Sequence, residues 1–561
     1  FRNVTGVQTC ALPIWELARE LRRHAGDDRL PVDLRGRLRE ASQRASDRAG
    51  RDTPPVPRPP KSPRPARAVV EAAPCATESG PPTPGLKRIL FVMLHPGFIR
   101  YYESAIRGLA DAGYDVHVAF EITRDKLGES VLAQRLAAAS PRITCGTTPP
   151  RVEGVRDFLA RADRSALRSG GGNSKGSSAE SRLRSWEHLA TTTRLMLDYL
   201  RFFEPAFAGA EKLRDRARKR LPRPFAATVR AASAAGPVGR RGLGRLLRLV
   251  EDAIPANPAI EDFIRAQHPD LLLVTPLIEL GSQQVDYVKS ARRLGVRSAL
   301  CVASWDNLTS KGLIRVVPDH VIVWNEAQKQ EAVTLHGVAP GQVVVTGAQL
   351  FDRWFAGRPS RSRDEFCRLV GLDPARPFVL YVGSSMFIAP DEIPFVERWL
   401  RALRGAADPS VATVGALLRP HPANEGPWMS FDPRRWPNAV VWPPVGSDPN
   451  APDFARDFFD SLYHCAAVVG INTSAQIEAG IIGRPVFTIR AAEFEHSQAG
   501  TLHFQHLVDP QTGLVQQAAT FDEHVGQLSR ALGPAADASL SRRFIASFIR
   551  PRGVELPVTP I

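Results

Sequence analysis

Short apolar runs alternate along this chain with longer segments whose apolar residues recur at helical spacing. The run at 88–94, RILFVML, is typical of a parallel strand buried on both faces. At 99–112 the apolar positions lie three and four residues apart, which indicates a helix, and Gly113 is a residue that ends helices. DVHVAF at 115–120 predicts the next strand. This strand–helix–strand unit is the building block of a doubly wound α/β sheet.

The same alternation returns after residue 260 and starts again near residue 377. The strand candidates are DLLLVTP, RSALCVAS, HVIVW and QVVVTG in the first group, and FVLYVGSS, ATVGALLRPHP, VVWPP, AAVVGINTS and PVFTIR in the second. We therefore predict an α/β protein with two doubly wound domains. Loops at the carboxyl ends of the strands are expected to face a cleft between them.

Segments outside this alternation define the remaining boundaries. Residues 150–258 contain long amphipathic segments and predict a helical insertion. The predicted division is a tail at 15–86, an N-terminal acceptor-side domain at 87–355, a C-terminal donor-side domain at 356–530, and a helix at 531–561 that packs back on the first domain. Within the tail, two segments have helical spacing, and the proline-rich stretch 51–86 is expected to be disordered.

The first residues form a separate case. Residues 4–14, VTGVQTCALPI, resemble the conceptual translation of a sequencing-library adapter. We therefore leave 1–14 out of the fold prediction, and expect an artificial N-terminus on a bacterial sequence of metagenomic origin.

Charge and cysteine content narrow the classes of function. The formal net charge is +15, with basic stretches at 215–225 and 239–250, which suit anionic lipid or phosphorylated substrates. These stretches lack interleaved aromatic residues, so we expect no nucleic-acid partner. The cysteines after Cys10 are scattered without a CxxC pair, which predicts neither a zinc site nor disulfides and favours a reducing cytoplasm. No apolar run is long enough for a membrane helix, so any membrane contact would be peripheral.

Polar residues follow the predicted strands of the second half. AAVVGI meets a predicted helix at 474–483 through Asn472, Thr473 and Ser474, and free amides at a helix start favour an anion such as phosphate. Glu478 lies about one turn further on, where it could accept hydrogen bonds from ribose hydroxyls. The alternative is ordinary helix capping, for which Asn, Thr and Ser are common.

Three further polar loops are predicted at the same sheet edge. They contain Ser384 and Ser385 after the first strand, Arg419 and His421 in LLRPHPAN, and Gln498 in EFEHSQAG. Each residue alone is an ordinary surface or turn residue. Together, the four loops predict a pocket for a charged, hydroxyl-rich ligand.

The first half offers candidate acceptor-side chemistry. His95 ends the first strand in LHPGF, where it could be a general base or a turn residue without a role. CVASWDNLTSKG places Trp305, Asp306, Asn307 and Lys311 after another strand. Asp306 is the second candidate base, and Lys311 could meet a phosphate; the alternative is a helix cap with a packed tryptophan. Glu279 is a weaker acceptor-side candidate.

The second half resembles the donor-binding domain of GT-B-fold glycosyltransferases and the related non-hydrolysing nucleotide-sugar 2-epimerases. The residues that carry the resemblance are GINTSAQIEAGIIGRPVFTI, RPHP and VVVTGAQLFD. It implies two Rossmann-like domains, with Asn472, Thr473 and Ser474 beside the donor diphosphate, Glu478 on the ribose and Gln498 at the sugar. The sequence departs from the epimerase pattern, because Thr473-Ser474 replaces a glycine pair.

The resemblance also implies a reaction that needs neither metal nor bound cofactor, with a nucleotide sugar as co-substrate. No GxxxxGK[ST], HExxH or Asp-x-Asp motif occurs in the sequence. We expect a glycosyltransferase of cell-envelope or capsule glycans, with a glycan or lipid-linked acceptor. The alternatives are a nucleotide-sugar 2-epimerase, a CDP-glycerol-type glycerophosphotransferase, and a scaffold without activity.

Overall fold

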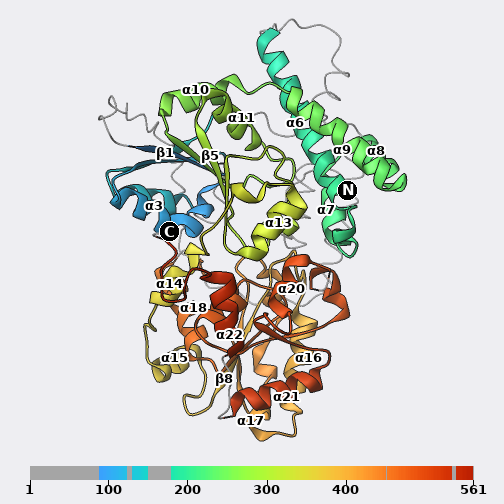
Figure 1. Ribbon diagram of the computed structural model, residues 1–561. Helices are drawn as coiled ribbons and strands as arrows, with labels where there is room; N and C mark the ends of the chain where they lie inside the picture. The colour runs from blue at the N-terminus through green and yellow to red at the C-terminus, as the bar shows by residue number, and fades with distance from the viewer. Residues whose placement is uncertain are drawn as a thin grey trace, which may run out of the picture. The chain divides into compact units, whose positions relative to one another are not determined.

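The computed structural model describes residues 87–122, 129–149, 178–449, 451–498, 500–533 and 539–559. Within these residues, seven strands form one parallel sheet and six form another (Figure 1). The prediction of two doubly wound α/β sheets is confirmed. The predicted tail and the first part of the predicted insertion lie outside the described residues.

The N-terminal sheet has the strand order β3-β2-β1-β4-β5-β6-β7. Its strands are β1 (Arg88–Met93), β2 (Asp115–Phe120), β3 (Ile143–Thr147), β4 (Leu271–Thr275), β5 (Arg297–Cys301), β6 (His320–Val323) and β7 (Val343–Val345). β1 lies in the interior of the sheet, with Leu90 beside His117 of β2 and Leu272 of β4. The order reverses direction between β1 and β4, as in doubly wound nucleotide-binding sheets.

Helices cover both faces of this sheet. They are α3 (Ile99–Asp111), α4 (Ser130–Ala138), α10 (Pro258–Gln267), α11 (Val285–Leu294), α12 (Asn307–Ser310) and α13 (Glu326–His336), with short η1 (Pro96–Phe98) and η3 (Pro340–Gln342). Residues of β1 alternate between two apolar clusters: Leu90 and Val92 pack in one, Phe91 and Met93 in the other. This alternation explains why the strand reads as an unbroken apolar run.

Between β3 and β4 the described chain is helical. This helical insertion consists of α6 (Ser178–Arg201), η2 (Pro205–Phe207), α7 (Glu211–Arg220), α8 (Arg223–Ala234) and α9 (Gly236–Ala253). α6, α8 and α9 pack against one another with their own apolar cluster and form the group at the upper right of Figure 1.

The C-terminal sheet has the order β10-β9-β8-β11-β12-β13. Its strands are β8 (Phe378–Val382), β9 (Gly415–Arg419), β10 (Ala439–Val441), β11 (Ala467–Gly470), β12 (Val486–Ile489) and β13 (Val515–Ala518). Its helices and short turns are η4 (Gln349–Phe351), α14 (Asp352–Ala356), α15 (Arg363–Val370), α16 (Ile393–Arg404), α17 (Pro409–Ala412), η5 (Gly426–Ser430), η6 (Pro433–Arg435), α18 (Pro452–His464), α19 (Ala475–Ile481), η7 (Ala492–Ser497), α20 (Leu502–Val508) and α21 (Phe521–Leu532).

The final segment runs from α22 (Ser539–Phe544) through η8 (Ile545–Ile549) back to the N-terminal sheet. Phe548 O accepts a hydrogen bond from Asn325 Nδ2 at 2.9 Å, and Ile549 O accepts one from Ala348 N at 2.9 Å. Asp352 then binds the last described residues: Arg550 Nη2 at 2.8 Å and the amide of Thr559 at 2.8 Å.

Candidate active site

The carboxyl edge of the C-terminal sheet collects the predicted donor-side loops. β9, β8 and β11 are neighbours in a parallel sheet, so the loops that follow them emerge side by side. The strand order reverses between β8 and β11, the position at which ligands bind in open α/β sheets. The residues at this edge are Ser384 and Ser385 after β8, Arg419 and His421 at the end of β9, and Asn472, Thr473 and Ser474 after β11.

Side-chain amides fix the loop after β11. Asn472 is buried, and its Nδ2 donates to Ser497 O at 2.6 Å. Gln476 Oε1 accepts from Thr473 N at 3.2 Å. These two amide groups therefore hold the loop, and the exposed Ser474 is its most accessible member.

The helix that follows is shorter than predicted. α19 spans Ala475–Ile481, whereas the sequence pattern predicts a helix over 474–483. The chain turns at Gly483, which has a φ of +84°. A seven-residue helix adds only a small dipole, so side chains must supply most of the attraction for an anion.

Two arginines act electrostatically on the carboxyl group of Glu478. Burial raises the pKa of Glu478 to about 7, against the opposing attraction of Arg353 and Arg419. Arg419 is buried between the rings of Phe454 and Phe458, each 4.9 Å from its guanidinium carbon. Its Nη1 donates to Ser461 Oγ at 3.3 Å and its Nη2 to Phe454 O at 3.2 Å, so Arg419 is held inside the sheet edge.

A cavity of about 640 Å³ opens beside Arg353. Its lining comes from α3, α14 and the final segment and comprises Ser104, Asp352, Arg353, Phe355, Ala356, Arg550, Val554, Glu555, Pro557 and Thr559. The cavity and Glu478 therefore share Arg353 as a neighbour.

A buried carboxyl group supports the loop after β8. Glu392 is fully buried and accepts hydrogen bonds from Ser384 N at 3.1 Å, Tyr381 OH at 3.1 Å and Trp428 Nε1 at 3.3 Å. Burial raises the pKa of Glu392 to about 7. A side chain on Gly383 would meet Glu392 Oε1 at 2.8 Å, which explains the glycine. The sequence prediction missed Glu392, because glutamate residues are usually exposed.

Gln498, which is predicted to lie at the donor sugar, is held by the end of the sheet. Gln498 is buried, and its Nε2 lies within hydrogen-bond distance of Ile471 O at 3.2 Å, Thr488 Oγ1 at 3.1 Å and Ile489 O at 3.2 Å. Its amide nitrogen is committed to backbone and hydroxyl partners and fastens η7 to the sheet. Gln498 also borders a cavity of about 300 Å³ at the ends of β12 and β13.

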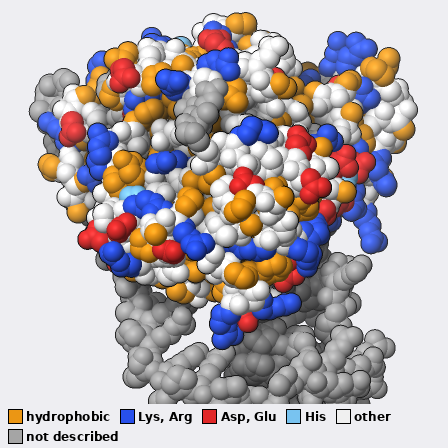
Figure 2. Space-filling view, turned by 90° about the horizontal axis from the view of Figure 1, so that it is seen from below, with side chains coloured by type: hydrophobic (Ala, Val, Ile, Leu, Met, Phe, Trp, Pro, Cys, Tyr) orange, Lys and Arg blue, Asp and Glu red, His pale blue; other side chains and the backbone are white. Residues whose placement is uncertain are grey.

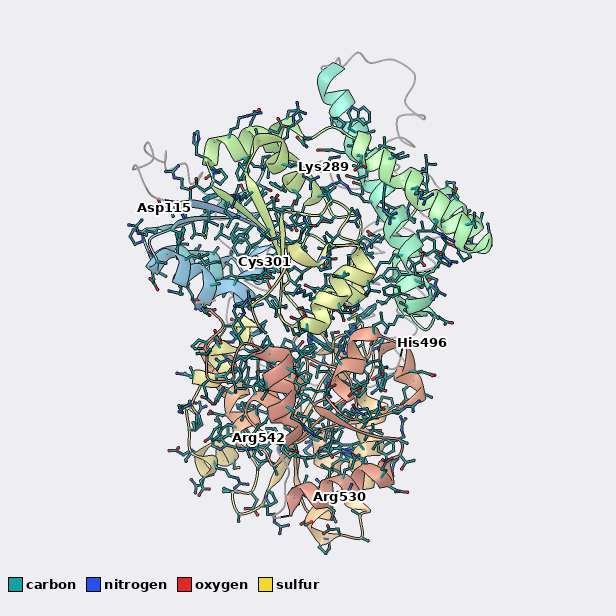
Figure 3. All side chains as sticks on the ribbon, viewed as in Figure 1. Asp115, Lys289, Cys301, His496, Arg530 and Arg542 are labelled. Carbon is teal, nitrogen blue, oxygen red and sulfur yellow. The ribbon has the colours of Figure 1, made fainter. Side chains whose placement is uncertain are left out.

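On the N-terminal side, the loop after β5 holds most of the predicted acceptor residues. Figure 3 marks Cys301, the last residue of β5, from which the chain enters this loop. Asn307 Oδ1 accepts from Ala303 N at 3.2 Å and Ser304 N at 3.1 Å, so Asn307 shapes the loop. Asp306 Oδ2 accepts from Ser310 Oγ at 2.8 Å.

Asp306 remains ionised despite its burial. Burial alone would raise the pKa of Asp306, but attraction to the protonated form of His503, the charge of Lys311 and hydrogen bonds from Ser304 and Ser310 outweigh it and lower the pKa. A carboxylate in this state can accept a proton or orient a hydroxyl group.

Polar side chains of helix α6 hold the loop after β5 in place. Arg201 Nη1 donates to Lys311 O and Gly312 O, both at 2.8 Å. One turn earlier, Asp198 accepts from Gly281 N at 2.7 Å and Leu313 N at 2.8 Å. The helical insertion therefore fixes the loop of Asp306 and also the loop of Glu279.

His95 and Glu279 each have a charged neighbour. His95 Nδ1 lies 3.3 Å from Glu129 Oε2, and burial lowers the pKa of His95 more than Glu129 raises it. Glu279 Oε1 binds Lys311 Nζ at 2.8 Å. His95 is therefore neutral near pH 7, in the form that can accept a proton.

Side chains from the two sheets meet at the loop after β5. Trp305 Nε1 donates to Ser474 Oγ at 3.1 Å, and the Trp305 ring stands edge-on to His503 of α20 at 4.8 Å. His503 Nδ1 lies 3.2 Å from Thr309 Oγ1, and burial lowers the pKa of His503 to about 4. The structure thus brings Asp306, Ser474 and a neutral His503 into one region. The stretch LHFQHL, with its two histidines, gave no signal for this in the sequence.

No protein-family model matches the sequence, and a comparison with curated protein sequences finds no match. Among solved structures, the chain is similar to the UDP-GlcNAc 2-epimerase of Methanocaldococcus jannaschii in complex with UDP-GlcNAc and UDP (11% identity, 82% of this chain and 98% of that chain, TM-score 0.42). It is also similar to a glycosyltransferase from Rickettsia africae (9%, 84% and 96%, 0.42) and to Acinetobacter baumannii MurG (10%, 82% and 94%, 0.39).

Proposed function

We propose that this protein is a GT-B-type glycosyltransferase that moves a sugar from a nucleotide-sugar donor to a cell-envelope or capsule glycan. One observation carries the proposal. The ionised Asp306 of one sheet lies in the loop whose Trp305 binds Ser474, at the position of the other sheet where the strand order reverses. A base and a donor-side loop are thereby brought together.

The proposed reaction is direct displacement at the anomeric carbon. Asp306 takes the proton of the acceptor hydroxyl, whose oxygen forms the new bond to that carbon as the bond to the diphosphate breaks. The electron pair leaves with the nucleoside diphosphate, which Ser474, Thr473 and the loop after β8 hold. His95 is the alternative base, since it is neutral and paired with Glu129.

The test of this function is incubation with nucleotide sugars, with and without a glycan acceptor. Release of nucleoside diphosphate that depends on acceptor supports glycosyl transfer. An epimerised nucleotide sugar formed without acceptor would instead identify the epimerase, and release of CMP from CDP-glycerol the glycerophosphotransferase. Absence of nucleotide binding in calorimetry would favour a scaffold.

Glu478→Ala is expected to weaken nucleoside diphosphate binding about ten-fold or more, because a charged hydrogen bond to ribose is lost. Since hydroxyl groups donate to the carboxylate, binding favours ionised Glu478. With a pKa raised to about 7, wild-type affinity should rise from pH 6 to pH 8.

Calorimetry with UDP, GDP and CDP over this pH range measures both effects. Glu397→Ala, at a half-buried position of α16, is the control and should bind as wild type. A Glu478→Ala protein with wild-type affinity and pH dependence would remove Glu478 from the donor site.

We further infer that the α8–α9 hairpin rests on an anionic membrane surface. Residues 222–250 contain six arginines and no acidic residue. Val238, Leu246 and Leu249 of this hairpin are 76%, 57% and 67% exposed. Apolar residues among arginines on one helical hairpin are typical of contact with anionic headgroups.

By contrast, Figure 2 shows charges of both signs interspersed on the face that carries α17 and α21. No helix among the described residues is long and apolar enough to cross a membrane.

Leu246→Ser combined with Leu249→Ser should reduce binding to phosphatidylcholine–phosphatidylglycerol vesicles about ten-fold, because two apolar contacts with the bilayer are lost. Co-sedimentation measures the bound fraction, and pure phosphatidylcholine should bind little. Leu369→Ser, at an exposed position of α15, is the control. Equal binding of all variants, or self-association through the hairpin in place of vesicle binding, would contradict the inference.

A further inference from the structure

We propose that α7 of the helical insertion completes a binding site for a phosphate group of the acceptor, formed by Arg216, Arg220 and Lys311 around Glu279. The inference deepens the proposed function and rests on it, because it names the acceptor as a phosphate ester. The shared chemistry is a phosphate monoester or diphosphate, either on a lipid carrier or on a soluble sugar.

Three separate segments converge at this site. Arg216 of α7 donates to Ser310 O, in the loop of Asp306, and its guanidinium carbon lies 4.9 Å from the centre of the Phe387 ring. One turn later, Arg220 Nη1 lies 3.4 Å from Leu280 O, next to Glu279. α7 therefore reaches both acceptor-side loops and, through Phe387, the loop after β8.

Cations outnumber carboxylates at the site. Lys311 Nζ lies 2.8 Å from Glu279 Oε1. Burial would raise the pKa of Glu279, but the positive charges of Lys311, Arg220 and Arg216 outweigh it and lower the pKa. Asp306 attracts Arg216 as a second carboxylate. Three cations thus share two carboxylates, and an added anion would balance the remaining positive charge.

One polar group of the site has no partner. The Nε of Arg216 is buried and makes no hydrogen bond. A buried donor without a partner costs about 1–3 kcal/mol, and donors of this kind are usually satisfied by a ligand or water. A planar guanidinium group suits the oxygens of a phosphate, which accept two parallel hydrogen bonds.

The location connects the site to the proposed chemistry. Lys311 is the residue that follows α12, whose first turn begins after Asp306. The negative charge of Glu279 also reaches His95, whose pKa it raises slightly against the larger effect of burial. A phosphate at Arg216 and Arg220 would therefore hold the acceptor beside both candidate bases. α7 continues directly into the α8–α9 hairpin, which we infer to rest on the membrane. A phosphate on a lipid carrier is therefore one natural ligand of the site.

The test is calorimetric titration of inorganic pyrophosphate into the full chain, saturated beforehand with whichever of UDP, GDP or CDP stabilises it most. A binding event that persists under saturation reports a second anion site. Arg216→Gln combined with Arg220→Gln should weaken that event at least ten-fold. Arg220→Gln alone should weaken it by a smaller factor, and this exposed position cannot endanger folding.

The matched control is Arg218→Gln combined with Lys219→Gln. These residues lie on the same helix, are 49% and 67% exposed at the side chain, and both bind Asp215. The control removes the same charge and should retain wild-type pyrophosphate affinity. Equal weakening in both double variants, or no binding event under saturation, would overturn the site. If no nucleotide stabilises the protein, the proposed function fails, while titration of the free protein still tests the site.

Competition identifies the source of the phosphate. Glucose 1-phosphate should displace pyrophosphate if a soluble sugar phosphate is the ligand. Vesicles that contain phosphatidic acid should displace it from wild type, but not from the Leu246→Ser, Leu249→Ser protein, if the phosphate is lipid-linked. Displacement by neither would contradict a phosphate-ester ligand.

Discussion

Asp306→Asn should lower kcat by about 10²–10⁴-fold, the range that a general base contributes. The asparagine keeps the size of the side chain and can still accept from Ser310 Oγ, so the loop after β5 should keep its shape. Nucleoside diphosphate affinity should change little, because the donor-side residues belong to the other sheet. Steady-state rates and calorimetry on the same preparation separate the two effects.

Two further variants test whether Asp306 is the general base. Asp364→Asn, on the exposed face of α15, should leave kcat unchanged. His95→Gln should have the smaller effect if Asp306 is the base. A larger loss in His95→Gln would transfer the role to the His95–Glu129 pair, and full activity in Asp306→Asn would remove Asp306 from the reaction.

Arg194→Met should lower the free energy of unfolding by about 3–5 kcal/mol, the usual cost of breaking a buried ion pair. Arg194 of α6 is completely buried and binds Glu251 Oε1 at 2.8 Å and Asp286 Oδ1 at 2.6 Å. Its loss leaves two buried carboxylates with less charge compensation, and it loosens α6 from α9 and α11. Urea unfolding measures the difference.

Exposed arginines provide the reference for this measurement. Arg218→Met, at a half-exposed position of α7, should change the unfolding free energy by less than about 1 kcal/mol. Adding Asp286→Asn to Arg194→Met should recover part of the loss, because one buried negative charge disappears. A loss below about 1 kcal/mol for Arg194→Met would show that the ion cluster does not anchor the insertion.

The fold was largely predictable because its central strands are apolar on both faces. β1, β8 and β11 pack between two helical layers, so their sequences are unbroken apolar runs. The pattern missed β3 and β13, whose sequences are ITCGT and VQQA. Both are edge strands with only part of their residues buried, so no strong hydrophobic signal marks them.

The candidate site was less predictable because its support comes from distant parts of the chain. Ser474 and Asp306 could be located because ligand-binding residues follow the carboxyl ends of parallel strands. This pattern could not show that Glu392 would be buried under Ser384 or that His503 would reach Thr309. Along α6, Arg194 and Arg201 look like solvated residues, yet the polar residues of this part of the helix are buried together with its apolar ones. Residue type alone does not distinguish a solvated charge from a buried, paired one.

The carboxylate of Asp352 ties together the two chain segments that pass between the sheets. The chain passes from one sheet to the other near this residue and returns through η8, and Asp352 joins both passages by binding Arg550 and Thr559. Any movement of one sheet against the other would therefore have to keep or break these contacts of Asp352. The hydrogen bond from Trp305 to Ser474 also joins the two sheets, so it would have to break if the sheets moved apart.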